Sequence, residues 1–188
     1  MLIDIGRLTE LIGIRAEGDE LVIGAATPHA TLATSDLARA DAPLLAHSAA
    51  LGGSVVVAGP GATRNIAAED FFTGFFETSL EPGELITAVR VPRRPGAAWG
   101  YQKFVRRAND WAIVGAAAID GRIALANMGP TPLRARAAEQ ALADGASAAQ
   151  AAELAAEGTE PGEDVHADRD YRRHLARVLT RRALEHRT

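Results

Sequence analysis

The chain has 188 residues, of which 47% are hydrophobic, so it is long and apolar enough to bury a core in one domain or in two small ones, and a disordered chain is excluded. Its net charge of -4 makes nucleic acid an unexpected partner, because phosphates are bound by an excess of cationic side chains. The lack of cysteine excludes disulfides, thiolate zinc sites and an iron–sulfur cluster held by this chain.

The N-terminal part is predicted to mix strands with short helices. Two apolar runs at 12–16 and 21–25 flank a polar, glycine-containing stretch, which is the pattern of a hairpin. The alanine- and leucine-rich stretch 28–51 favours one or two short helices, with Ser35 as an N-cap. Two further strands are expected at 54–58 and 63–67, joined by a turn at Gly59-Pro60-Gly61.

The polar turn Glu81–Glu84 marks the predicted domain boundary, with one domain at 1–81 and a second at 82–188. Strand-like runs follow it without an intervening helix, at 85–91, 100–107, 112–119 and 122–128. Asp120-Gly121 tolerates the left-handed backbone of a two-residue hairpin loop, so an antiparallel sheet is expected here.

Three helices are predicted to follow this sheet. Thr131-Pro132 is read as the start of the first helix, and Ser147 as the cap of the second, which stops near Gly158. An acidic loop is expected at 159–170. The final helix carries one apolar stripe, made of Tyr171, Leu175, Val178, Leu179 and Ala183. The fold class is therefore α+β, with an antiparallel sheet packed against C-terminal helices.

Among the polar and aromatic residues, Lys103 stands out because it is the single lysine in a chain whose other cations are arginines. It marks a need for a compact ammonium or is a chance survivor in an arginine-rich composition. Arg106, Arg107 and Asp110 are predicted to form an ion-pair network at a strand end, and Trp111 to anchor the core. The five histidines show no metal-ligand spacing.

Several segments, in order, resemble the FAD-binding medium subunits of carbon monoxide dehydrogenase and xanthine dehydrogenase-type molybdenum hydroxylases. The segments are Leu2–Leu11, Leu21–Ala25, Ala68–Gly74, Glu77–Leu85, Tyr101–Ala108, Asp110–Gly115, Gly129–Pro132 and Tyr171–Leu175. The resemblance implies an FAD-binding region followed by a C-terminal domain of antiparallel strands and helices. It also implies partners: an iron–sulfur subunit that reduces the FAD, and a molybdopterin subunit that reduces the iron–sulfur centre.

Two glycine-rich loops of the family have no counterpart in this sequence. The first subdomain, with its Ala-Gly-Gly-x-Ser/Thr loop, is missing, and a second gap is expected between Ser48 and Ser54. Such loops hold a diphosphate by converging backbone N–H groups. Gly59-Pro60-Gly61 is expected to be a turn rather than a substitute, because proline has no N–H to donate. The subunit is therefore expected to be a truncated one.

The resemblance places Ile86 and Lys103 beside the isoalloxazine ring, with Tyr101 on the same strand face as Lys103. An ammonium there favours electron acceptance by stabilising negative charge on the reduced ring. The alternative is a surface lysine, a core isoleucine and a core tyrosine. The first hypothesis is thus a flavoprotein electron-transfer subunit; the second is an FAD-free scaffold or interaction module. No apolar run is long enough to cross a bilayer and no signal peptide is recognisable, so a cytoplasmic location is expected.

Overall fold

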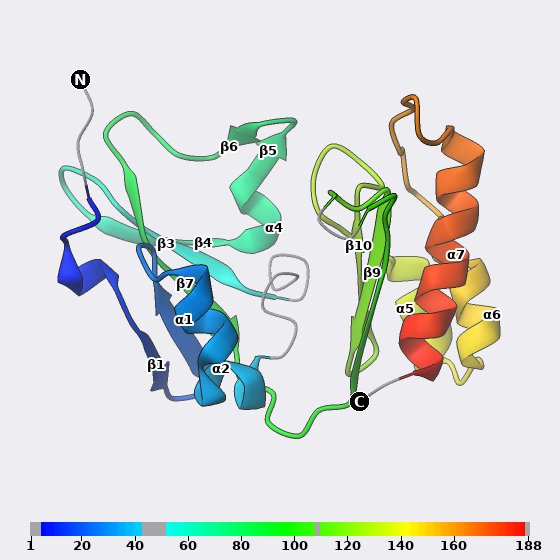
Figure 1. Cartoon of the computed structure of the whole chain (residues 1–188), viewed down its shortest axis with the longest axis horizontal. Helices are drawn as coiled ribbons and strands as arrows, with labels where there is room; N and C mark the ends of the chain where they lie inside the picture. The colour runs from blue at the N-terminus through cyan, green and yellow to red at the C-terminus, as the bar shows by residue number, and fades with distance from the viewer. Residues whose placement is uncertain (1–4, 43–51, 108–109, 187–188) are drawn as a thin grey trace. The chain divides into compact units, whose positions relative to one another are not determined.

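The computed structural model describes residues 5–42, 52–107 and 110–186, and the chain divides into two compact units (Figure 1). The first unit is built from the chain up to Phe71 and from Thr78 to Gly96. The second is built from Phe72–Glu77 and from the chain beyond Ala97. No helix within the described ranges is both long and apolar enough to span a bilayer.

The first unit contains a five-stranded antiparallel sheet in the order β1-β2-β7-β3-β4. Its strands are β1 (Ile14–Glu17), β2 (Glu20–Gly24), β3 (Ser54–Ala58), β4 (Thr63–Ala67) and β7 (Leu85–Pro92). A 3-10 turn η1 (Thr9–Leu11) precedes them, and α1 (His29–Thr34) and α2 (Asp36–Asp41) follow the first hairpin. The predicted hairpin, both later strands and the Ser35 cap of α2 are confirmed. The part of the helical prediction beyond Ala42 lies outside the described residues.

The position of β7 corrects one prediction. This strand was expected to start the C-terminal antiparallel sheet, but it pairs with β2 and β3 in the first sheet instead. It is the central strand there, with Val91 1% exposed against Leu21 in a small apolar core. A central antiparallel strand can come from any later point of the chain, and its alternating pattern does not say which sheet it joins.

A small hairpin lies between β4 and β7. It starts with the single turn α4 (Ala68–Phe71), whose first residues include Glu69 and Asp70 as expected for acids at a helix start. The hairpin strands are β5 (Phe72–Gly74) and β6 (Glu77–Thr78), which form a two-stranded sheet. The backbone N–H of Ser79 closes the hairpin by donating to the carbonyl of Phe71 at 2.9 Å.

The second unit has a four-stranded antiparallel sheet in the order β11-β10-β9-β8, packed against helices. The strands are β8 (Trp99–Phe104), β9 (Val114–Ile119), β10 (Arg122–Ala126) and β11 (Leu133–Arg134). The helices are α5 (Arg136–Ala143), α6 (Ala148–Glu153) and α7 (Arg169–Glu185), and α7 lies along β8 and β9. The Asp120-Gly121 loop has positive φ at both residues, which confirms the predicted hairpin.

The helices of this unit differ from the prediction in two details. The first helix begins at Arg136 after an uncapped Ala135, because Leu133–Arg134 add a short strand where Thr131-Pro132 was expected to start the helix. On α7, Leu175, Leu179 and Ala183 are buried, whereas Val178 is only partly buried and Tyr171 is 41% exposed. The buried stripe is rotated to include Ala176 and Thr180, because small side chains let the helix approach the sheet closely.

Candidate functional site

Tyr101 and Lys103 lie on the edge strand β8, two residues apart and therefore on one face of the sheet. The opposite face packs against α7: Gly100 lies so close to this helix that a Cβ built on it would be 2.0 Å from the carbonyl oxygen of Ala183. Phe104, on the same side as Gly100, makes an edge contact with Tyr171 of α7. The candidate site is thus on the face of β8 turned away from the helix.

The neighbouring strand has small residues at the positions beside this pair. Ala117 is the cross-strand partner of Tyr101, and Gly115 is the partner of Lys103. No bulky side chain of β9 therefore stands next to the tyrosine ring or the lysine chain. Ala117 is itself buried, whereas Lys103 is exposed, so a flat ligand would reach this face along the edge strand.

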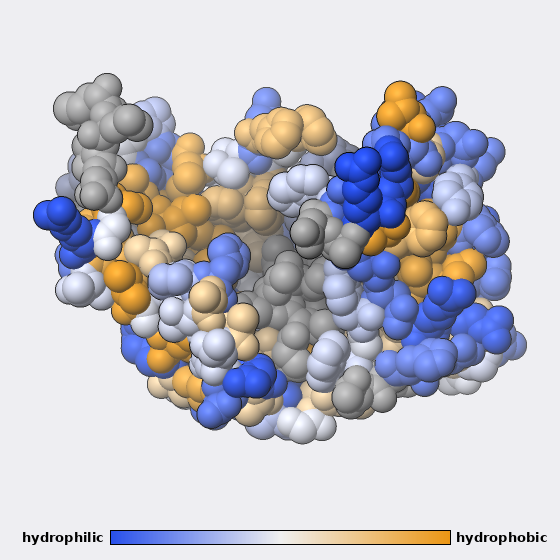
Figure 2. All heavy atoms as spheres, in the orientation of Figure 1, coloured by the Kyte–Doolittle hydropathy of each residue, from blue (hydrophilic) through white to orange (hydrophobic). Residues whose placement is uncertain are grey.

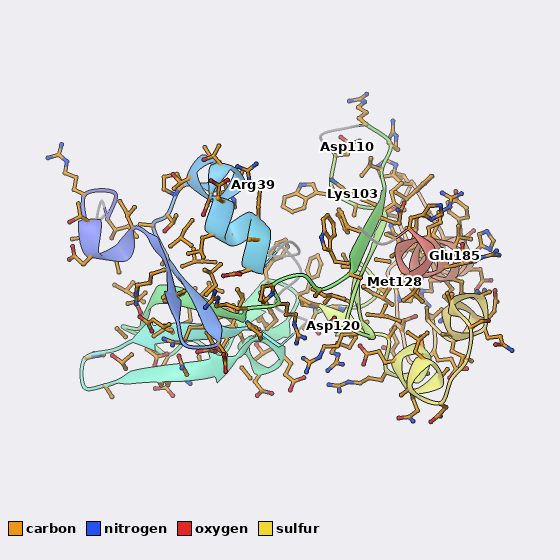
Figure 3. All side chains as sticks on the ribbon, turned by 90° about the horizontal axis from the view of Figure 1, so that it is seen from below. Arg39, Lys103, Asp110, Asp120, Met128 and Glu185 are labelled. Atoms are coloured by element: carbon orange, nitrogen blue, oxygen red, sulfur yellow. The ribbon has the colours of Figure 1, made fainter. Side chains whose placement is uncertain are left out.

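The ammonium of Lys103 is oriented by the loop that follows β8. Its Nζ donates to the backbone carbonyl of Asp110 at 2.7 Å, and Figure 3 shows the two residues near one another. The carbonyls of Ala112 and Ile113 accept from the Asn127 side chain at 3.1 and 3.2 Å. The ammonium of Lys103 has three N–H donors, and the Asp110 carbonyl accepts one hydrogen bond from it. The other donors can bind a ligand.

Tyr101 is partly buried, and burial raises the pKa of its hydroxyl above the usual value. The phenol is therefore neutral at physiological pH, and its hydroxyl can donate or accept a hydrogen bond.

Ile86 lies in the other unit, on β7, where it is partly buried and pairs with Val57 next to a bulge in the strand. The turn just before it is fixed by a two-pronged ion pair, in which Arg64 donates to both oxygens of Glu84 at 2.7 and 2.8 Å. Arg64, together with the N–H of Glu81, lowers the pKa of Glu84 to about 2. Of the three predicted site residues, Tyr101 and Lys103 therefore belong to the second unit and Ile86 to the first.

The segment Gly59-Pro60-Gly61 forms the turn between β3 and β4, as predicted. The N–H of Gly59 is used within the turn, because it donates to the carbonyl of Ala62 at 2.9 Å. Pro60 has no N–H to offer. This turn therefore lacks the converging donors that a diphosphate requires.

Two predictions about the loop after β8 are wrong. Trp111 is 95% exposed rather than a core anchor, because β9 begins only at Val114 and Trp111 falls in the preceding loop. No ion pair joins Arg106, Arg107 and Asp110 among the residues the structure describes. Instead, the guanidinium of Arg106 lies 3.2 Å from the His166 ring. Arg106, His166 and Trp111 are among the residues that line a hollow of about 380 Å³.

The residue that holds this loop in place was not predicted from the sequence. Arg172 is 2% exposed on α7 and donates to the carbonyl of Ile113 and, at 2.6 Å, to the carboxylate of Asp164. Nothing distinguishes it from the other arginines of this helix by spacing. Asn127, with a φ of 61°, carried a weak signal, because asparagine tolerates the left-handed region. In the described parts of the chain, no cluster of three acidic or histidine side chains is arranged to hold a metal ion.

Two family models match this chain. Residues 99–186 match the CO dehydrogenase flavoprotein C-terminal domain, and residues 44–94 match the FAD binding domain in molybdopterin dehydrogenase. The first match coincides with the second unit of the structure, which carries Tyr101 and Lys103. The other contains Ile86 and the turn at Gly59–Gly61.

Individual relatives are similar over nearly the whole chain. The carbon monoxide dehydrogenase medium chain of Hydrogenophaga pseudoflava is 34% identical over 229 residues, covering 97% of this chain and 80% of the relative. The 6-hydroxypseudooxynicotine dehydrogenase complex subunit alpha of Paenarthrobacter nicotinovorans is 31% identical, covering 98% and 78%. The aligned stretch of 229 residues exceeds the 188 residues of this chain, so the first relative has residues inside it that this chain lacks.

Solved structures show the same likeness in three dimensions. Carbon monoxide dehydrogenase from Hydrogenophaga pseudoflava, in a form lacking the Mo-pyranopterin moiety, superposes with a TM-score of 0.88 at 35% identity, covering 97% of this chain and 79% of that one. Quinoline 2-oxidoreductase from Pseudomonas putida 86 gives a TM-score of 0.83 at 31% identity, covering 94% and 78%.

Proposed function

We propose that this chain, which belongs to the family of FAD-binding medium subunits of carbon monoxide dehydrogenase-like molybdenum hydroxylases, is the electron-transfer flavoprotein subunit of such a complex. FAD held by this chain would supply an electron-accepting ring between an iron–sulfur subunit, itself reduced by a molybdopterin subunit, and an acceptor. We expect this chain to act in the cytoplasm with these partners. The observation that carries the proposal is the face of β8 turned away from α7, where Tyr101 and Lys103 lie beside small residues of β9 on a fold shared with these subunits.

The residues of this chain have a defined part in that function. FAD, when bound, supplies the electron-accepting ring. The ammonium of Lys103 favours negative charge beside it, because an opposite charge at short range is strongly stabilising where water is excluded. Asp110 holds that ammonium in place through its carbonyl. Tyr101 offers a neutral ring and hydroxyl, and Ile86 an apolar contact. The relatives differ in the substrate their names print, so the proposed role is electron transfer rather than substrate choice.

The described residues fit the ring of FAD but not its diphosphate. The turn at Gly59–Gly61 uses its own donors, and the sequence between Ser48 and Ser54 has no counterpart of the family's second glycine-rich loop. Each lost charge-assisted hydrogen bond costs roughly 1.5–3 kcal/mol. Several such losses weaken binding by several powers of ten at about 1.4 kcal/mol per power.

This mismatch favours a second candidate function, an FAD-free scaffold that keeps the partner-binding surfaces of the family. The two candidates are separated by purifying the chain and titrating it with FAD. We expect a colourless protein that binds FAD no more tightly than the high micromolar range by itself. Stoichiometric binding below micromolar FAD by the isolated chain would reveal a phosphate site elsewhere and refute the argument from the missing loops. If flavin is retained only when the partner subunits are present, the electron-transfer role stands; if it is never retained, the scaffold role replaces it.

A further inference from the structure

Two phenylalanines project into solvent at the tip of the β5–β6 hairpin. Phe75 is 75% exposed and Phe76 is 96% exposed, and their rings touch edge to face with centroids 4.5 Å apart. Two of the five phenylalanines of the chain therefore lie where they add nothing to a hydrophobic core. In Figure 2, a pale orange group projects at the place that the β5–β6 hairpin occupies in Figure 1, with hydrophilic atoms beside it.

The backbone at the tip is strained as well. Phe76 has a φ of 62°, a left-handed conformation that bulky side chains rarely adopt. Glycine or asparagine fits this region at lower cost. Strained backbone that presents a side chain to solvent is typical of binding sites, because folding alone gains nothing from it.

The hairpin is closed beneath this tip. The carboxylate of Glu77 folds over Gly74, where a built Cβ would lie 2.9 Å from its oxygen. The Ser79 N–H closes the base on the carbonyl of Phe71, and Phe71 is buried to 4% exposure. The aromatic pair is therefore presented at the end of a closed hairpin, which lowers the entropy lost on binding.

The charged residues that precede and follow the pair in the sequence favour one kind of partner. Residues 65–89 contain five acidic residues and no basic one. Of these acids, Glu84 is neutralised by Arg64, whereas Glu69, Asp70, Glu77 and Glu81 are exposed. Glu77 is exposed next to Phe76, and the sequence on either side of the hairpin is acidic, so this segment repels anionic lipid and nucleic acid. It complements a protein surface that has an apolar pocket edged by arginine or lysine.

We propose that Phe75 and Phe76 are the anchor by which this chain docks into a basic-edged apolar pocket on another protein subunit of its hydroxylase complex. This rests on the proposed membership of such a complex. Aromatic side chains at the centre of an interface commonly carry most of its binding energy. The strained backbone at Phe76 is then explained by docking, because asparagine or glycine would fit the same φ with less strain.

The test uses the tagged full chain, produced together with the iron–sulfur and molybdopterin subunits of its complex. Retained iron and molybdenum per chain report assembly, and the affinity for the purified partner subunits is measured by interferometry. Phe76→Asn should weaken association by about tenfold or more, while its melting temperature stays equal or rises because the backbone strain is relieved. Val165→Asn is the matched control, since Val165 is 94% exposed on a loop, and it should change neither quantity.

Each other outcome overturns the inference. Wild-type affinity in Phe76→Asn and in the double variant Phe75→Ser/Phe76→Asn would show that the tip is not at the interface. A wild-type dimer that the double variant converts to monomer would make a second copy the occupant. Binding of the tip to neutral lipid vesicles without any subunit would make it a lipid anchor. If the wild-type chain retains no subunit at all, the proposed membership of a complex fails together with the docking site, whereas the FAD titration tests the flavin role separately.

Discussion

Gly100→Ala tests how closely α7 packs on the sheet that carries Tyr101 and Lys103. A Cβ at this position would lie 2.0 Å from the Ala183 oxygen and 2.9 Å from its carbonyl carbon, and both are backbone atoms. Ordinary contacts begin near 3.4 Å, so strand or helix must shift by more than an ångström. In an open strand the same change would stabilise by roughly 0.5–1 kcal/mol, because glycine has more chain entropy to lose. Overpacking of this kind costs about 1–3 kcal/mol or more.

We therefore expect Gly100→Ala to lower the free energy of unfolding by about 1–3 kcal/mol, measured by urea denaturation followed by circular dichroism. Gly115→Ala is the matched control on the next strand, because its Cβ would meet Ala126 at an ordinary 3.4 Å. The control should stay within about 0.5 kcal/mol of wild type. If Gly100→Ala is as stable as the control, α7 does not lie against β8 as described, and the orientation of the site face loses its support.

Two other substitutions probe the helix stripe and the turn before Ile86. Leu175→Ala should lower the free energy of unfolding by roughly 2–5 kcal/mol and Val178→Ala by clearly less, because Leu175 is 6% exposed and Val178 is only partly buried. Equal effects in denaturation would contradict the orientation of α7 that buries Leu175. Glu84 has a pKa lowered from 4.5 to about 2, chiefly by Arg64, so its ionised form stabilises the fold above about pH 4.5, and this contribution is lost as the pH falls towards 2. Glu84→Gln should remove that part of the acid dependence of the melting temperature, and an unchanged acid profile would show that the ion pair is not formed.

Local patterns predicted most individual elements, because short-range chemistry determines them. The Asp120-Gly121 hairpin, the Ser35 cap and the Ser147 capping box follow from residue types that satisfy specific backbone groups. The strand Ser54–Ala58 was predicted with its observed ends. Of the predicted site residues, Tyr101 and Lys103 lie on one strand face as their spacing requires.

The errors arose where distant contacts decide. The partner of β7 depends on two hairpins far back in the sequence, which no local pattern around Leu85–Pro92 specifies. Trp111 was assigned to the core by its apolar character, yet the strand begins three residues later and leaves it in solvent. Arg172 is buried because it donates hydrogen bonds to Asp164, eight residues earlier, and to Ile113, 59 residues earlier, and no local pattern specifies the second partner.

The central place of β7 bears on how this fold accommodates changes in chain length. The hairpins β1–β2 and β3–β4 never pair with each other, since β7 lies between them and bonds to one strand of each. Residues gained or lost between Asp41 and Ser54 therefore leave every ladder in register. A cut at residue 81, by contrast, would remove the strand that joins the hairpins, and an isolated two-stranded hairpin is only marginally stable in water. The fold thus tolerates shortening between Asp41 and Ser54. It does not tolerate division at residue 81, where the sequence most suggests a boundary.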